Sequence, residues 1–264
     1  MTARIIALIS KKGGVGKTTS AVNFAAAFAE MGRRALLIDL DPQASASLSL
    51  GVRRGELAPS AADILLRRSA LEEVIRPSSA AGLDLVTGSI DLASLESEAA
   101  YQRSEEMRLA THLAASRLND YDAVFIDCPP AFTLLSRNAI AACDGYVVPA
   151  VPHFLAVEGI RSLVESIDRL RHRCQSGGPL LGILPTMVDF RTRLAQEMLD
   201  EIRAQFGGHV FAVSVRTNIR IAEAPGRGQT IFQYDPEATG AGAYRLAAEE
   251  LILRLEDVGC PARD

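Results

Sequence analysis

Residues 10–19 read Ser10-Lys11-Lys12-Gly13-Gly14-Val15-Gly16-Lys17-Thr18-Thr19, and this stretch decides the fold. An apolar run, Ile5–Ile9, precedes it, and an alanine-rich segment with helical periodicity follows it, with Gly32 well placed to end that helix. The stretch matches the phosphate-loop pattern G-x-x-x-x-G-K-[ST] except at its first position, where Lys11 replaces glycine. A strand, a glycine-rich loop and a helix in this order predict a site that binds phosphate groups.

The loop contains the residue types that phosphate binding requires. Glycines let backbone N–H groups turn inward around phosphate oxygens, and the following helix points its positive end at the same anion. Lys17 can reach the β- and γ-phosphates of a nucleotide, and the Thr18 hydroxyl can ligate Mg²⁺. The alternative is a glycine-rich turn with chance lysines, but the motif and its context agree. The expected nucleotide-binding residues of the loop are Lys12, Gly13, Gly14, Val15, Gly16, Lys17, Thr18 and Thr19.

Lysine is confined to this loop. The chain has 28 basic residues and a net charge of −4, and its only lysines are Lys11, Lys12 and Lys17. An ammonium group on a flexible stem is not replaceable there by a planar guanidinium, so the loop is where lysine is retained in an arginine-rich protein. The slightly negative net charge by itself predicts no nucleic-acid partner.

Several classes of protein are excluded by composition. No run of 18 or more apolar residues predicts a transmembrane helix, and the N-terminus lacks the shape of a cleaved signal peptide. The cysteines show no C-x-x-C spacing, which indicates neither a zinc site nor a disulfide framework. We therefore expect a protein of the reducing cytoplasm. The four cysteines are Cys128, Cys143, Cys174 and Cys260.

Apolar strands alternate with helices along the 264 residues. This alternation predicts one α/β P-loop NTPase domain over residues 1–264, with a mostly parallel twisted sheet flanked by helices on both faces and no separate N-terminal DNA-binding domain. Gly51–Ser79 is expected to be a polar surface excursion with one short helix. The predicted strands are Arg4–Ser10, Ala35–Asp39, Leu83–Thr87, Ala123–Asp127, Tyr146–Pro149 and Leu180–Pro185. The predicted helices are Lys17–Met31, Arg103–Leu118, Ala131–Ala142, Leu155–Arg173, Arg191–Phe206 and Ala243–Leu255.

Carboxylates follow two of these strands. Asp39 and Asp41 stand in Ile38-Asp39-Leu40-Asp41-Pro42, and Asp127 precedes Cys128-Pro129-Pro130. Ligands of an open parallel sheet sit at the carboxyl ends of its strands, so we expect these aspartates beside the phosphate loop, where they can serve a metal ion and an attacking water. The alternative is that each aspartate caps a turn or a helix, and Asp41 before Pro42 fits a cap well.

The phosphate loop has the form K-G-G-x-G-K-T, and further motifs accompany it. They are Asp39-Leu40-Asp41-Pro42-Gln43, Asp127-Cys128-Pro129-Pro130 and Arg216-Thr217-Asn218-Ile219-Arg220-Ile221-Ala222-Glu223-Ala224-Pro225. Together they resemble the ParA/Soj type of DNA-partitioning ATPases in the ParA/MinD superfamily, over nearly the whole chain. One departure is Asp-Pro-Gln-Ala-Ser where the family often has Asp-Pro-Gln-Gly-Asn.

The resemblance implies a role for each matching residue. Lys12 is the signature lysine, which reaches the nucleotide of a partner subunit, and Lys17 binds the nucleotide of its own subunit. Asp127 is similar to the Walker B aspartate that holds Mg²⁺ through a water, with Asp39 as a supporting residue of the metal shell. Asp41 is similar to the aspartate that positions the attacking water. Base contacts come from segments near Thr186 and from Asn218 to Pro225.

The resemblance also implies a function. It predicts a cytoplasmic, nucleoid-associated ATPase that uses ATP and Mg²⁺, forms an ATP-dependent homodimer, binds DNA without sequence preference and is stimulated by a ParB-like centromere-binding protein. The alternatives are a ParA-like ATPase that positions a protein complex or organelle, and a metabolic ATP-dependent enzyme or metal-cluster carrier on the same fold. Membrane targeting is not expected, because the last helix has an apolar stripe and an acidic-leaning polar face.

DNA contacts are expected from arginines of the C-terminal third. If they converge on one face of a dimer, they form a patch that contacts phosphates. The alternative is that they are ordinary solvated arginines, and Arg220 is favoured because it lies in the matching motif. The candidates are Arg191, Arg193, Arg216 and Arg220, with Arg203 and Arg227 nearby.

Overall fold

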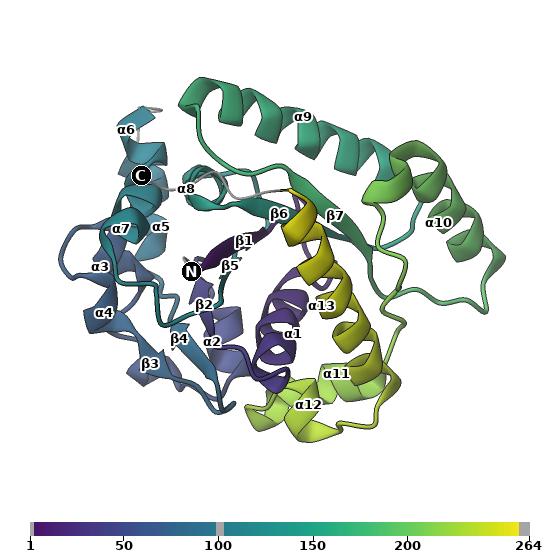
Figure 1. The fold of residues 1–264 in the computed structure, drawn as a ribbon, viewed down its shortest axis with the longest axis horizontal. Coiled ribbons are helices and arrows are strands. Elements are labelled where there is room, and N and C mark those ends of the chain that lie inside the picture. The colour runs from purple at the N-terminus through teal and green to yellow at the C-terminus, as the bar shows by residue number, and fades with distance from the viewer. Residues whose placement is uncertain (1–2, 99–102, 259–264) are drawn as a thin grey trace.

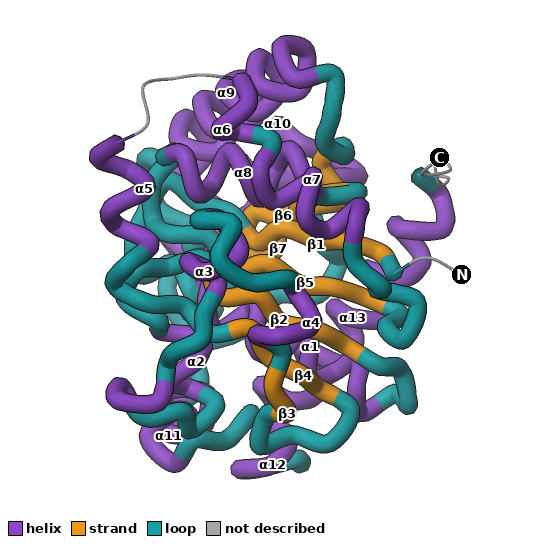
Figure 2. Tube along the Cα trace, turned by 90° about the vertical axis from the view of Figure 1, so that its left-hand side faces the viewer, coloured by secondary structure: helices purple, strands orange, loops and turns teal. Residues whose placement is uncertain are grey.

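The computed structural model describes residues 3–98 and 103–258. A seven-stranded sheet runs through the centre of the molecule (Figures 1 and 2), with the strand order β3-β4-β2-β5-β1-β6-β7. All neighbouring strands pair in parallel except β3, which pairs antiparallel with β4 at one edge. The predicted α/β fold with a mostly parallel sheet is confirmed. The strands are β1 Arg4–Leu8, β2 Ala35–Asp39, β3 Arg76–Pro77, β4 Leu83–Val86, β5 Ala123–Asp127, β6 Gly145–Ala150 and β7 Leu180–Pro185.

Helices cover both faces of the sheet, because successive strand side chains point to opposite faces. Ile5 and Ile9 belong to a core shared with α8 and α9, whereas Ile6 and Leu8 belong to a core shared with α1 and α13. The longer helices are α1 Lys17–Glu30, α7 Arg108–Ala115, α8 Leu134–Ala142, α9 Ala156–Cys174, α10 Arg193–Phe206 and α13 Thr239–Asp257. The shorter ones are α2 Ser45–Ser49, α3 Ala61–Leu65, α4 Leu71–Val74, α5 Leu92–Glu98, α6 Arg103–Glu106, α11 Ile219–Glu223 and α12 Ile231–Tyr234.

Helix α1 is held against the sheet by aromatic packing. The Phe24 ring stacks on Phe125 of β5 at a centroid distance of 6.2 Å and meets Tyr244 of α13 edge-on at 6.0 Å. The Tyr244 hydroxyl lies 3.1 Å from the Ser20 hydroxyl, so the helix is also tied to α13 by a buried hydrogen bond. Truncating a buried aromatic ring of this kind costs about 3–5 kcal/mol. This packing fixes the direction in which the N-terminus of α1 points.

The expectation for Gly51–Ser79 is wrong in two respects. The segment contains a 3₁₀ turn at Arg54–Glu56, the two helices α3 and α4, and strand β3, rather than one short helix. It is also not wholly a surface excursion, because Ile64, Leu65 and Leu71 are fully buried in the main core. Most of its apolar residues fall in two short runs, 61–66 and 70–75, with Arg67 and Arg68 between them, too short to show a continuous period.

The predicted helix Arg103–Leu118 is also wrong as a single element. It is broken at Met107 into α6 and α7. The buried Asn138 side chain of α8 lies at the break, where it accepts a hydrogen bond from the Leu109 N–H at 3.0 Å and donates to the Glu105 carbonyl at 2.8 Å. A side chain from another helix thus satisfies the backbone groups that the break frees.

The cysteines behave as small core residues. Cys128, Cys143 and Cys174 are buried and unbridged, while Cys260 lies outside the described residues. Among residues 3–98 and 103–258, no helix combines the length and apolar character needed to cross a membrane. The apolar stripe of α13 packs on the core, with Tyr244, Ala248 and Leu251 buried.

Candidate active site

The loop between β1 and α1 is shaped by two left-handed glycines. Gly14 has φ 72° and Gly16 has φ 77°, a conformation that residues with a side chain rarely adopt. Helix α1 begins after Gly16 without a side-chain cap and without an acidic residue in its first turn. The free N–H groups at this end attract an anion, because they add to the positive end of the helix dipole.

A second loop supports the phosphate loop from the end of β7. The Thr186 hydroxyl donates a 2.7 Å hydrogen bond to the Val15 carbonyl, and both residues are buried. A Cβ atom added at Gly16 would contact both Thr186 and Met187, at 3.7 Å each. The segment near Thr186 therefore fixes the backbone of the phosphate loop, a role that the sequence did not reveal.

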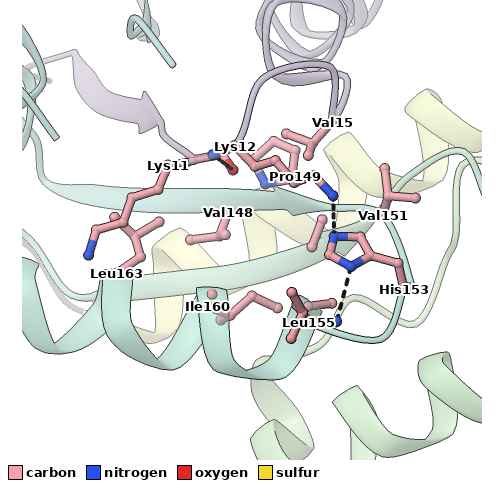
Figure 3. Close-up of a pocket in the computed structure, with 14 residues that line it drawn as sticks. Lys11, Lys12, Val15, Val148, Pro149, Val151, His153, Leu155, Ile160 and Leu163 are labelled. Atoms are coloured by element: carbon pink, nitrogen blue, oxygen red, sulfur yellow. Dashed lines mark hydrogen bonds between the residues drawn. The ribbon is translucent and has the colours of Figure 1, made fainter. Parts of the chain in front are cut away.

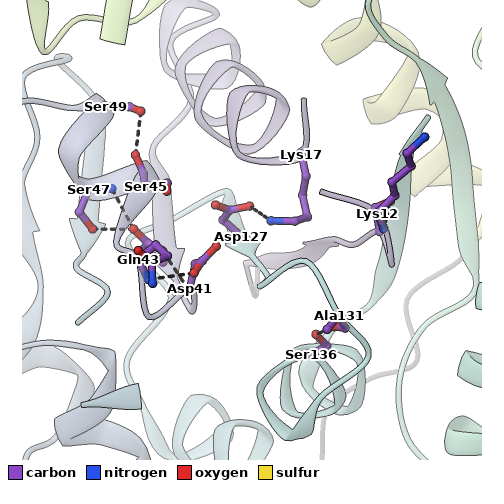
Figure 4. Close-up of polar contacts among 12 residues, drawn as sticks. Lys12, Lys17, Asp41, Gln43, Ser45, Ser47, Ser49, Asp127, Ala131 and Ser136 are labelled. Carbon is purple, nitrogen blue, oxygen red and sulfur yellow. Dashed lines mark hydrogen bonds and ion pairs between the residues drawn. The ribbon is translucent and has the colours of Figure 1, made fainter. Parts of the chain in front are cut away.

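Lys17 and Asp127 form a buried ion pair at the centre of the site. The Lys17 ammonium lies 3.2 Å from Oδ1 of Asp127, with 6% and 0% of the two side chains exposed (Figure 4). Burial opposes the charge of Lys17, but Asp127, Cys128 and Asp41 together outweigh burial and hold the pKa of Lys17 above its ordinary value. The structure thus brings together the lysine of the loop and the carboxylate at the end of β5.

Asp39 lies directly opposite Asp127 in the register of β2 and β5. Its carboxylate accepts hydrogen bonds from the Ser47 N–H at 2.9 Å, the Ser47 hydroxyl at 2.7 Å and the Asp41 N–H at 3.1 Å. Burial and the neighbouring Asp127 charge raise the pKa of Asp39 to about 7. Three acids, Asp39, Asp41 and Asp127, thus lie near a single ammonium group, that of Lys17. This excess of negative charge favours the binding of an added cation.

Ser47 and Gly88 complete this network, and sequence reasoning missed both. The Gly88 N–H donates to the Ser47 hydroxyl at 3.0 Å. A Cβ atom at position 88 would lie 2.6 Å from the Asp41 carbonyl and 2.9 Å from Cγ of Asp39, so only glycine fits there. The Ala-Ser-Ala-Ser run after Gln43 offered a signal for a serine at this position but none for its partner.

We expect Asp39→Asn to remove a pH-dependent part of the stability. A carboxyl whose pKa is raised by folding binds more protons in the folded chain than in the unfolded chain. Its contribution to the free energy of unfolding is therefore lost as pH rises from its ordinary pKa of 3.8 to about 7. Denaturant unfolding between pH 4 and 8, without nucleotide, should show wild type losing about 1–3 kcal/mol relative to Asp39→Asn. Parallel curves for the two proteins would contradict this environment for Asp39.

Asp41 caps a turn at the mouth of the site. Its Oδ1 atom accepts a 2.9 Å hydrogen bond from the Gln43 N–H, and only 7% of the residue is exposed. The turn interpretation of Asp41 therefore holds in this structure. It does not exclude a role toward a water molecule, because this bond engages one of the two carboxylate oxygens.

The residues present fit a magnesium ion that is bound together with phosphate. The Oδ2 atom of Asp127 is buried without a hydrogen-bond partner, and Thr18 stands in the first turn of α1 beside it. Carboxylate and hydroxyl oxygens suit Mg²⁺, which usually takes one or two protein ligands and completes its shell with phosphates and water. In the part of the chain that the structure describes, no three acidic, histidine or cysteine side chains converge to hold a metal alone.

The other two lysines of the loop turn away from this centre (Figures 3 and 4). Lys12 extends to His153, with Nζ 2.8 Å from the Nε2 atom of the ring. Lys11 donates to the Ser162 carbonyl and hydroxyl and to the Ser166 hydroxyl of α9, each at 3.0 Å. The loop therefore presents one ammonium group to its own site and two to the β6–α9 region.

A small cavity lies beyond the first turn of α1, on the side of α11. Of the two residues expected to contact the base, Pro225 lines this cavity and Asn218 does not. The Asn218 side chain instead caps α11, accepting from the Arg220 N–H at 2.8 Å, and donates to the Thr239 hydroxyl at 2.9 Å. The cavity is lined by Thr19, Val22, Asn23, Ser49, Ile221, Ala224, Pro225, Gln229 and Ile231.

The candidate DNA-binding arginines are exposed, and most carry a local acidic partner. Arg191 pairs with Asp189 at 2.8 Å, and Arg193 pairs with Glu197 at 2.7 Å. Arg220 lies 3.1 Å from Glu223 and 3.4 Å from Asp235. Arg216 instead stacks over the Phe190 ring at 4.7 Å. Exposed ion pairs of this kind are weak, so a phosphate can replace the carboxylate.

Comparison with known proteins places this site in context. A family model described as an AAA domain matches residues 3–177. Chromosome-partitioning ATPase Soj of Thermus thermophilus is 41% identical over 256 residues, covering 96% of this chain and 97% of that protein. Chromosome partitioning protein ParA of Caulobacter vibrioides is 36% identical over 255 residues, covering 96% of each.

A solved structure is similar over the same range. Cobyrinic acid a,c-diamide synthase from Mycobacterium smegmatis, with bound ATP analog and magnesium, superposes with a TM-score of 0.83 at 30% identity. The match covers 96% of both chains.

Proposed function

Because this chain belongs to the ParA/Soj family of chromosome-partitioning ATPases, we propose that it is an ATP-driven switch that pairs with a second copy and holds DNA while paired. Hydrolysis of the nucleotide then separates the two copies and releases the DNA. The observation that carries the proposal is the division of the loop lysines. Lys17 is buried at the site of its own subunit, whereas Lys12 points away from that site toward the outer face of the β6–α9 loop.

The residues of one subunit bind the nucleotide. The amides of Gly13–Gly16 and the open N-terminus of α1 bind the phosphates, with the Lys17 ammonium beside them. Thr18 and Asp127 would hold Mg²⁺, supported by Asp39, and the ion would neutralise charge on the phosphates. Lys17 exchanges its partner Asp127 for phosphate oxygens, and Asp127 becomes available to the metal shell. Asp41, at the mouth of the site, orients the attacking water.

The second copy completes the site by contributing its Lys12. A lysine on a flexible stem suits this role, because it can leave its own subunit and reach across an interface. The paired form binds nucleoid DNA through arginines without reading bases, and a ParB-like protein at a centromere-like site stimulates hydrolysis. A protein that works in this way acts in the cytoplasm, on the nucleoid.

A second candidate function is that of an ATP-dependent metabolic enzyme, because cobyrinic acid a,c-diamide synthase, which was solved with an ATP analog, shares the fold. DNA co-sedimentation with ATP, ADP or no nucleotide separates the two, with salt varied from 50 to 300 mM. We expect binding with ATP alone, falling steeply with salt and equal on unrelated DNA sequences. Binding that ignores the nucleotide, or no binding at all, would overturn the DNA-partitioning proposal.

Arg220→Glu is expected to abolish ATP-dependent DNA retention near physiological salt. The reversed charge removes a phosphate contact and repels the backbone, and each paired molecule carries the change twice. Nucleotide binding should be intact, because Arg220 contacts Glu223 and Asp235 rather than the phosphate loop. Arg220→Lys is the matched control, since it keeps the charge and should keep retention. Unchanged retention in Arg220→Glu would remove this residue from the DNA-binding surface.

A further inference from the structure

The Lys12 side chain is held on its own subunit by a contact that the proposed pairing must break. Its ammonium lies 2.8 Å from Nε2 of His153, a residue that precedes α9 (Figure 3). Figure 4 shows Lys12 directed away from the Lys17–Asp127 pair. The same side chain cannot hold His153 and reach a nucleotide in a second subunit at once.

Lys12 shares the His153 ring with a second donor, and only a neutral ring can accept its hydrogen bond. The Leu155 N–H points at Nδ1 of the ring at 3.2 Å, so both ring nitrogens face a donor. A neutral imidazole has one accepting nitrogen, and a protonated one has none. A neutral ring that accepts from Lys12 loses the Leu155 bond, and a ring that accepts from Leu155 turns an N–H toward the ammonium. The contact therefore holds Lys12 weakly and fails when His153 gains a proton.

The charged side chains around His153 in the described residues are those of the phosphate loop and α9. The phosphate loop contributes Lys11 and Lys12, and strand β6 contributes no charged side chain. On α9 the nearest acid in sequence is Glu158, which is 71% exposed and pairs with Arg161. Within the described residues, no acid lines the pocket that His153 and Lys12 share. Burial and the Lys12 charge both lower the pKa of His153.

We infer that His153 is a positioning residue for Lys12, which it keeps on its own subunit until a second copy draws the lysine away. The inference rests on the proposed role of Lys12 in pairing. When Lys12 leaves, the imidazole loses a neighbouring cation, so it binds a proton more readily in the paired form. Pairing then takes up protons and becomes tighter as pH falls.

The contact itself is tested by NMR titration of the histidine ring protons in the nucleotide-free protein. The His153 signal is assigned by its absence in His153→Gln. We expect the pKa of His153 to rise in Lys12→Met, which keeps the stem and removes the charge. The ring signals of the exposed His209 should be the same in the two proteins and serve as the control. Equal His153 titrations in wild type and Lys12→Met would overturn the inference, because Lys12 would then not lie at the ring.

The consequence for pairing is tested by the dimer dissociation constant between pH 6 and 8, with Mg²⁺ and a non-hydrolysable ATP analogue. Titration of the analogue is common to all variants and cancels in their comparison. As pH falls from 8 to 6, the dimer dissociation constant of wild type should decrease about threefold to tenfold more than that of His153→Gln. His209→Gln, which removes an exposed imidazole at the end of α10, should follow wild type.

Two results would contradict this account in different ways. If the dimers of wild type and His153→Gln form with the same pH dependence, His153 does not hold Lys12 on its own subunit. The proposed function would be left intact by that result. Absence of dimers in every protein at every pH would overturn the proposed pairing, and this inference with it.

Discussion

Lys17→Ala is expected to abolish binding of Mg·ATP, with affinity falling at least about 100-fold. The substitution removes the buried ammonium that faces the phosphate loop, and charge-assisted contacts to phosphate in a water-poor site are worth several kcal/mol. Isothermal titration calorimetry with ATP and ADP measures the loss. Lys11→Ala is the matched control, because Lys11 is a lysine of the same loop that contacts α9 instead, and it should bind nucleotide as wild type does.

The same substitution should destabilise the nucleotide-free protein. Lys17 neutralises Asp127, which is completely buried, and removing one partner of a buried pair costs about 3–5 kcal/mol. Asp127→Asn in the Lys17→Ala background removes the unpaired charge and should recover much of that stability without recovering nucleotide binding. Near-normal ATP affinity in a folded Lys17→Ala protein would contradict the site.

Asp41→Ala is expected to reduce ATP hydrolysis by about 100-fold and to trap a nucleotide-bound dimer. Loss of a group that orients or activates the attacking water typically costs 10²–10⁴ in rate, while the phosphate loop that binds ATP is untouched. Single-turnover hydrolysis and retention of labelled ATP on the purified protein measure the two effects. The Asp41 carboxylate also closes the turn at Gln43, so a small loss of stability is expected.

The Asp41→Asn variant separates these two contributions. Asp41→Asn keeps an oxygen that can accept from the Gln43 N–H but lacks the negative charge, so it should restore stability and leave hydrolysis slow. Hydrolysis at the wild-type rate in both variants would show that Asp41 only caps the turn.

The sequence predicted most of the sheet and the glycine-rich loop between β1 and α1, because both depend on local patterns. Strands β2, β5 and β7 were predicted to the residue, since each is a continuous apolar run that is buried on both faces. The meeting of Asp39 and Asp127 followed from the rule that the carboxyl ends of parallel strands share one edge. Register pairs these two residues directly, which the rule alone could not state.

Features that depend on contacts between distant segments could not be predicted. His153 lies 141 residues from Lys12 in the chain, and nothing in either motif indicates that they meet. The backbone groups freed by the break at Met107 are satisfied by Asn138 of another helix, a contact that the helical period of the segment does not indicate. Gly88 is required by the closeness of Asp39 and Asp41, a steric reason that appears only in three dimensions.

Whether nucleotide pairs two copies of the chain is the central question, and sedimentation velocity answers it most directly. The protein is run with Mg²⁺ and a non-hydrolysable ATP analogue, with Mg·ADP, and without nucleotide, beside Lys12→Ala. We predict twice the chain mass of 28.3 kDa with the analogue alone, and a single chain in the other wild-type runs and in Lys12→Ala. A wild-type protein that binds the analogue at saturation and stays at one chain mass would contradict the switch.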